Sequence, residues 1–227
     1  RSTESASKFR ARGISAMAIA EAPDANALLA GDADLIVLGV KPYQIVDVLN
    51  EIKDEIAPNA VVISMAAGIK LETMAAVVPA NKNLIRTMPN TPALVGMGVT
   101  GVAPASSAAE DAIDATLELF NAVGVALEIT EDQIDAMSAV SGSGPAWVFY
   151  IMEQWEKIAV NHGFTAEQAA LMVRGTLAGS IDLLAQSDKE LAELRANVTS
   201  PGGTTEQIIA SLEKADLQGI FEQSLQQ

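Results

Sequence analysis

Short, unbroken apolar runs recur along the first half of the chain and then stop, and this change of pattern most constrains the fold. Runs without polar alternation are typical of strands buried on both faces of a parallel sheet. The runs that we expect to form strands are 14–18, 35–40, 61–65, 84–88, 99–102 and 125–129. Amphipathic stretches that we expect to form helices separate them, at 5–12, 25–29, 45–56, 71–78 and 108–123. This alternation predicts an α/β layer with a parallel sheet.

After Thr130 the pattern is helical throughout. The expected helices are 131–140, 145–162, 166–185, 190–195, 205–214 and 217–225. Thr130 and Thr165 stand where N-caps are expected, and Gly163 stands where a helix should end. The fold class is therefore α/β followed by all-α, and we expect an α/β domain over 1–129 and a helical domain over 130–227.

Small residues recur along the expected helix 166–185, which allows a neighbouring helix to approach closely. Two interpretations remain open at this point. The helix can pack within a tight bundle of its own chain, or it can form a homodimer interface, because one small bundle leaves much apolar helix surface to cover.

Composition excludes several classes of function. The 227 residues carry a net charge of −15, which disfavours general binding to nucleic acid or to anionic membranes. There are no cysteines and a single histidine, His162, so neither a disulfide framework nor a thiolate or multi-histidine metal site is expected. No apolar run reaches the roughly 18–20 residues of a membrane span, and residues 1–12 are too polar for a signal peptide. We expect a cytoplasmic protein without metal.

Three of the predicted strands end in unusual turns. Lys41-Pro42 follows the strand at 35–40, Ala66-Ala67-Gly68 follows the strand at 61–65, and Pro89-Asn90 follows the strand at 84–88. Proline and glycine also punctuate ordinary loops, so each turn alone is weak evidence. Ligands of open α/β sheets bind at the carboxyl ends of the strands, and three such ends together favour a dinucleotide cleft.

The run 198–205, Val-Thr-Ser-Pro-Gly-Gly-Thr-Thr, packs four hydroxyls and two glycines just ahead of an expected helix. Glycines bare the backbone N–H groups, and a helix start adds partial positive charge, so the run suits a carboxylate or a phosphate. The alternative is a helix cap on a surface loop.

These motifs, in this order, resemble the pyrroline-5-carboxylate reductase family. The segments that carry the resemblance are 40–42, 66–68, 86–92, 96–98, 141–146 and 198–205. The resemblance implies a Rossmann-like domain followed by a helical domain that binds substrate and forms a homodimer or a higher homo-oligomer. It implies reduction of the cyclic imine 1-pyrroline-5-carboxylate to L-proline, the last step of proline biosynthesis, with NADPH as cofactor and NADH as the alternative.

The resemblance also implies site residues. Substrate contacts would come from Ser200, Gly202, Gly203, Thr204 and Thr205. Thr205 would be the catalytic residue and would hydrogen-bond the ring nitrogen. Cofactor contacts would come from Ser2, Asn26, Val40, Lys41, Pro42, Met65, Ala66, Ala67, Asn90 and Asn197.

One departure from the family is large. The family opens with a strand, a G-x-G-x-M-G turn and a helix that hold the cofactor pyrophosphate, and the 227 residues contain no such motif. The sequence therefore resembles a family member without its first ~30 residues, and its Rossmann-like sheet is expected to be incomplete. If these residues are the whole polypeptide, we expect weak cofactor binding and a chain that is inactive.

Two other functions remain open. A reductase of the β-hydroxyacid dehydrogenase type shares the domain plan, but such enzymes generally use a lysine of the interdomain helix, where this chain offers only Lys157. The other alternative is a truncated dimer that binds a carboxylate without catalysis.

Overall fold

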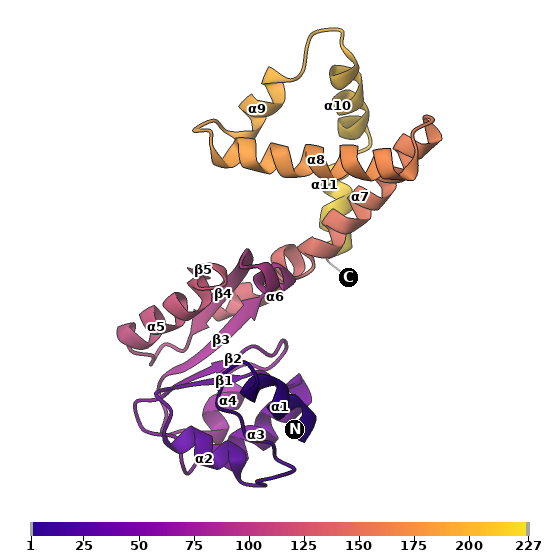
Figure 1. Ribbon diagram of the computed structural model, residues 1–227. Coiled ribbons are helices and arrows are strands. Elements are labelled where there is room, and N and C mark those ends of the chain that lie inside the picture. Colours follow the sequence, from indigo (N-terminus) through magenta and orange to yellow (C-terminus); the bar gives the residue numbers. More distant parts are fainter. Residues whose placement is uncertain (1, 226–227) are drawn as a thin grey trace. The chain divides into compact units, whose positions relative to one another are not determined.

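The structure is a computed structural model that describes residues 2–225 (Figure 1). The chain forms two compact units, Arg1–Pro145 and Ala146–Gln227, and each unit is described by itself. The first unit holds one sheet of five strands in the order β1-β2-β3-β4-β5. The strands are β1 (Leu35–Leu38), β2 (Val61–Ser64), β3 (Leu84–Pro89), β4 (Gly98–Pro104) and β5 (Gly124–Glu128).

The first three strands are parallel, as the apolar runs predict, whereas β4 runs antiparallel to β3. The expectation of a parallel sheet is therefore wrong at this one pairing. A parallel return needs a crossover of a dozen or more residues, and residues 90–97 are too few. The longer connection through α5 (Glu110–Asn121) then allows β5 to lie parallel to β4.

The expected strand at 14–18 is also wrong, because these residues form no regular structure. Ile14 and Met17 are exposed, and only Ala18 of this stretch is buried. Within the described residues, β1 pairs with β2 alone, so the stretch has no ladder of hydrogen bonds. Apolar composition without a partner strand does not produce a strand.

Alternating side chains of the strands feed two cores, one on each face of the sheet. Val62 faces α2 (Ala25–Gly31), α3 (Ile45–Ile52) and α4 (Leu71–Val77), with Leu49 and Met74 fully buried beside it. Val61 and Ile63 face α5 on the other side, where Phe120 is buried. The first helix of the described residues is α1 (Thr3–Arg10).

The segment from Thr130 to Pro145 belongs to the sheet unit, although its sequence is helical in pattern. It contains η3 (Glu131–Gln133), α6 (Ile134–Met137) and a π-helical turn, η4 (Ser138–Gly142). Thr130 is the N-cap of η3, as expected, and it also forms a capping box with Gln133. The expected helix at 131–140 is thus divided into three short pieces.

The second unit consists of helices. They are α7 (Gly144–Asn161), which starts at the end of the first unit, α8 (Ala166–Ala185), α9 (Leu191–Asn197), α10 (Thr204–Lys214) and α11 (Leu217–Leu225). Thr165 caps α8 with a capping box, and Gly163 between α7 and α8 has a φ of 94°, which favours glycine. Trp147 stacks on Phe221, with ring centroids 5.2 Å apart. Figure 1 shows α8 as a long helix, with an open loop joining α9 to α10.

Candidate functional site

The carboxyl ends of β1, β2 and β3 lie side by side, because the three strands are parallel neighbours. This arrangement brings together three predicted turns, which contain Lys41, Ala67 and Asn90. Lys41 is exposed and directly precedes η1 (Pro42–Gln44), with Pro42 in its first turn. The predicted cleft residues 40–42, 65–67 and 90 therefore share one edge of the sheet.

The turn after β2 consists of small residues that are partly exposed. A hydrogen bond holds its backbone, because the Ala66 N–H donates to the hydroxyl of buried Ser64 at 3.3 Å. Ala67 is exposed and small, and Gly68 has a φ of 80°. Met65 packs against Gly39 of the neighbouring turn, since a Cβ at Gly39 would lie 3.3 Å from the Met65 methyl. The turn at 65–68 carries no acidic or basic side chain.

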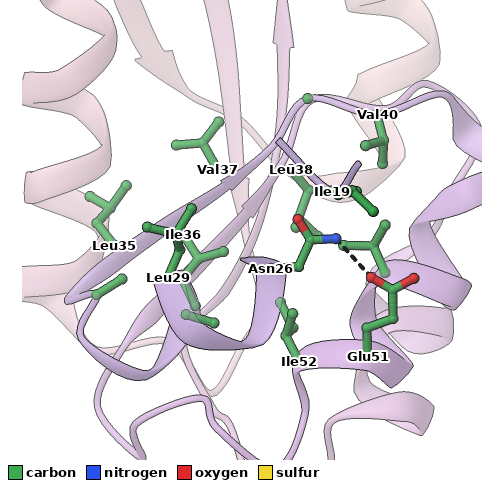
Figure 2. A pocket seen from close by; sticks show the side chains of 14 residues that line it. Ile19, Asn26, Leu29, Leu35, Ile36, Val37, Leu38, Val40, Glu51 and Ile52 are labelled. Carbon is green, nitrogen blue, oxygen red and sulfur yellow. Dashed lines mark hydrogen bonds between the residues drawn. The ribbon is translucent and has the colours of Figure 1, made fainter. Parts of the chain in front are cut away.

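A pocket of about 400 Å³ lies along β1, between α2 and α3. Figure 2 shows that aliphatic side chains form most of its wall, among them Leu29, Val37 and Val40. Its polar side chains are those of Asn26 and Glu51, and Asn26 Nδ2 donates to Glu51 Oε2 at 2.7 Å. Asn26 and Val40, both predicted cofactor contacts, thus line one pocket.

Two predicted cofactor residues lie elsewhere. The Ser2 hydroxyl caps α1 by accepting from the Ser5 N–H at 3.2 Å. Asn197 is exposed and ends α9 in the helical unit.

The 198–205 loop leads into α10 in the helical unit. Gly202 has a φ of 70° and open space where a Cβ would stand, so only glycine holds this backbone without strain. Its N–H donates to the carboxylate of Glu206 at 2.7 Å. The loop therefore presents a backbone donor that holds a carboxylate oxygen.

The hydroxyls of this loop do not cap α10. Its N-cap is Gly203, which has no side chain to offer, and Thr204 and Thr205 occupy the first turn. The first N–H groups of a helix lack partners within the helix and attract anions. This geometry argues against the simple helix cap and leaves the half-buried Thr205 at the positive end of an eleven-residue helix.

A buried ion pair joins Arg86 to Glu131, a partner that the sequence does not identify. Arg86 in β3 has a side chain that is 5% exposed, and its Nη1 lies 2.8 Å from Glu131 Oε1. The same oxygen accepts from the Leu71 N–H at 2.7 Å. The Arg86 guanidinium is therefore paired with an anion inside the sheet unit. In the sequence, the acidic residues at 131–132 indicate only the start of a helix. They do not predict that Glu131 pairs with Arg86.

Lys157 does not have the surroundings of a catalytic lysine. It forms an ion pair with Glu153 one helical turn away, and both side chains are 59% exposed. This placement gives no support to the β-hydroxyacid alternative. In the part of the chain that the structure describes, no helix is long and apolar enough to cross a membrane. Residues 2–225 also contain no group of three acidic, cysteine or histidine side chains placed to share a metal ion.

The fold and these sites define a class, the nicotinamide-dependent reductases with an α/β domain followed by a helical domain. Residues 1–68 match the family profile described as NADP oxidoreductase coenzyme F420-dependent, and residues 131–227 match the profile for pyrroline-5-carboxylate reductase dimerisation. The chain belongs to the pyrroline-5-carboxylate reductase family.

Three relatives illustrate the similarity. The pyrroline-5-carboxylate reductase of Methanosarcina acetivorans is 36% identical over 86% of this chain and 73% of its own length. A solved pyrroline-5-carboxylate reductase from Coxiella burnetii is 35% identical, with a TM-score of 0.91 over 100% of this chain and 83% of that one. The Plasmodium falciparum pyrroline carboxylate reductase, solved with NADP bound, is 31% identical, with a TM-score of 0.77 over 88% of this chain and 76% of that one.

Proposed function

We propose that this chain reduces 1-pyrroline-5-carboxylate to L-proline with NADPH, as a cytoplasmic homodimer or higher homo-oligomer. The observation that carries the proposal is the 35% identity to a solved pyrroline-5-carboxylate reductase across the whole of this chain. The similarity thus includes both the sheet unit and the helical unit. The relative that was solved with NADP bound supports a nicotinamide cofactor.

The sheet unit supplies the cofactor contacts in this proposal. The exposed Ala67 and the left-handed Gly68 give a surface that a planar ring can approach closely, and Lys41 gives a cation at the same edge. A bound nicotinamide would supply the hydride, while the protein supplies position and electrostatics. Asn26 and Val40 would contribute from the pocket beside β1.

The helical unit supplies the carboxylate site. The N–H of Gly202 already holds a carboxylate, that of Glu206, at 2.7 Å. Ser200, Gly203 and Thr204 surround this donor in the loop. A substrate carboxylate that displaces Glu206 from this N–H would lie close to Thr205 in the first turn of α10.

The reaction itself asks little acid–base chemistry of these residues. A hydride adds to the carbon of the C=N bond, the π electrons move to nitrogen, and one proton completes the ring amine. If the imine binds already protonated, no side chain has to supply that proton. Thr205 then fixes the ring nitrogen by a hydrogen bond, and orientation of this kind contributes up to about 7–11 kcal/mol in favourable cases.

The test is NADPH oxidation in the presence of the cyclic imine, with Thr205→Ala compared with wild type in an intact-length version of the protein. We expect kcat/KM for the imine to fall about tenfold, the value of one hydrogen bond to a charged group, with unchanged NADPH affinity. Thr199→Ala is the matched control, because its hydroxyl is committed to the Arg195 carbonyl at 2.6 Å in the same loop. Wild-type turnover in Thr205→Ala would remove Thr205 from the mechanism. NADPH binding without imine-dependent oxidation would favour the non-catalytic carboxylate-binding alternative.

A further inference from the structure

The side-chain amide of Asn90 is fully engaged within the sheet unit. Its Oδ1 accepts from the Val99 N–H at 2.8 Å, which closes the connection between β3 and β4. Its Nδ2 donates to the carbonyl oxygen of Ser141 at 3.2 Å and to the Ser141 hydroxyl at 3.1 Å. One side chain therefore joins the end of β3 to a segment about fifty positions further along.

Ser141 belongs to the π-helical turn η4, a wide turn that is uncommon and often marks functional sites. The turn ends with the Ser143 N–H donating to the Ser138 carbonyl at 2.9 Å. Gly142 packs against the β3 side chain Met88, whose methyl lies 3.0 Å from the place of a Cβ. The turn is therefore a packed element of the sheet unit.

The location of Asn90 gives this bond a functional meaning. Asn90 follows β3, and β3 ends at the same sheet edge as the turns at 40–42 and 65–67, because β1, β2 and β3 are parallel. By holding Ser141, Asn90 keeps η4 at the edge where the proposed cofactor contacts lie. Nothing else in the described chain gives Ser141 a side-chain partner.

We infer that Asn90 is a positioning residue for the reductase, which holds the Ser138–Gly142 turn against the cofactor edge instead of donating to the cofactor. The inference rests on the proposed function. It revises the family-based expectation of a direct cofactor contact, because the donors of the amide are already in use. The ordered turn then forms a fixed wall of the nicotinamide end.

Asn90→Asp is the variant that isolates this role. The aspartate keeps an oxygen for the Val99 N–H but loses the donor, and its charge faces the Ser141 carbonyl oxygen. Asn121→Asp is the matched control, because Asn121 also accepts from a backbone N–H, that of Ala126 at 2.8 Å, and its side chain is exposed. Both variants add one negative charge and keep their acceptor bond.

The first readout is hydrogen exchange of the backbone amides at 138–144 in the full chain. We expect Asn90→Asp to speed exchange there about tenfold, the effect of one or two lost hydrogen bonds, and Asn121→Asp to leave it unchanged. Ser141→Ala removes only the hydroxyl acceptor and should give about a threefold effect. Unchanged exchange in Asn90→Asp would overturn the inference.

The second readout separates positioning from cofactor binding. In the imine assay we expect Asn90→Asp to lower kcat about tenfold while the dissociation constant of NADPH changes less than twofold. A weakened NADPH affinity with unchanged exchange would mean direct contact, and faster exchange with wild-type kcat would mean that the turn has no part in the reaction. Absence of imine-dependent oxidation in the wild-type protein would refute the proposed function instead. Hydrogen exchange at 138–144 and NADPH affinity would then still test whether the bond from Asn90 to Ser141 holds the turn.

Discussion

The sheet unit buries its large apolar side chains, whereas the helical unit leaves most of its own exposed. In the sheet unit Ile45, Leu49 and Ile63 have no exposed area. Among residues 146–225, by contrast, only the small or medium side chains Ala169 and Val173 are buried. The exposed set of that unit includes Phe149, Leu171 at 76% exposure and Ile181.

The two units therefore obtain their stability in different ways. A sheet with a core on each face can fold on its own contacts. A unit that exposes contiguous apolar surface on its helices needs a second surface to cover it. Because the family profile over these residues describes a dimerisation region, a second copy of the chain is the natural partner.

The largest expected effect tests the sheet core. Leu49→Ala removes a side chain with no exposed area, and we expect the free energy of unfolding to fall by about 2–5 kcal/mol. Leu28→Ala, at a site 53% exposed in the same unit, should cost less than about 0.5 kcal/mol. Chemical denaturation of both variants measures the pair. Equal losses would show that the sheet unit lacks the self-sufficient core described here.

A pair of glutamates compares electrostatics in the two units. Glu131→Gln leaves Arg86 without its anion at 5% side-chain exposure, and we expect a loss of about 2–3 kcal/mol, which is less than for a fully buried pair because the Glu131 side chain is 30% exposed. Glu156→Gln disturbs the pair with Arg174, which is 67% exposed, and should cost less than about 1 kcal/mol. Thermal or denaturant unfolding distinguishes them, and a larger loss at Glu156 would reverse the comparison.

Self-association tests the exposed helical surface. Ile181→Asp places a charge on α8 at a site 61% exposed, and we expect the dimer dissociation constant to rise about tenfold or more. Gln223→Asp in α11 is the control, because it replaces an exposed polar side chain. Sedimentation over a range of concentrations provides the measurement. A monomeric wild-type chain would leave the apolar surface to another partner.

The smallest expected effect concerns a helix start in the helical unit. Thr165 accepts from the Gln168 N–H at 3.2 Å, and Thr165→Ala should lower the free energy of unfolding by about 1 kcal/mol. The Thr165 hydroxyl also contributes, after the backbone N–H of Glu167 itself, to lowering the pKa of Glu167. NMR titration should therefore find the Glu167 pKa nearer its ordinary value in the variant. An unchanged pKa would mean that the hydroxyl does not reach that carboxylate.

The sequence predicts much of this architecture because burial leaves a clear pattern. The helices at 166–185 and 217–225 have the predicted bounds, and five of the six predicted strands form. An apolar run, however, indicates that a strand is buried but not in which direction it runs. The antiparallel direction of β4 follows instead from the short connection at 90–97. The stretch 14–18 has the composition of a strand but no neighbour to pair with.

The candidate sites were predictable only in part. Parallel strand ends must lie at one edge, and this rule placed the turns at 40–42, 65–67 and 90 together. Long-range side-chain bonds leave no local signature, so neither the Asn90–Ser141 contact nor the Arg86–Glu131 pair could be derived. The roles of Thr205 and of the cofactor contacts stay predictions.

The π-helical turn has one further consequence, which concerns the rotational phase of its own side chains. A π-turn spends one more residue than an α-turn on the same hydrogen-bonded loop. Each residue of an α-helix turns the side chains by about 100°, so deleting one residue from 138–142 would shift the side chains of this turn by about that angle. The single extra residue in η4 thus sets which of its side chains faces Asn90, and that side chain is Ser141.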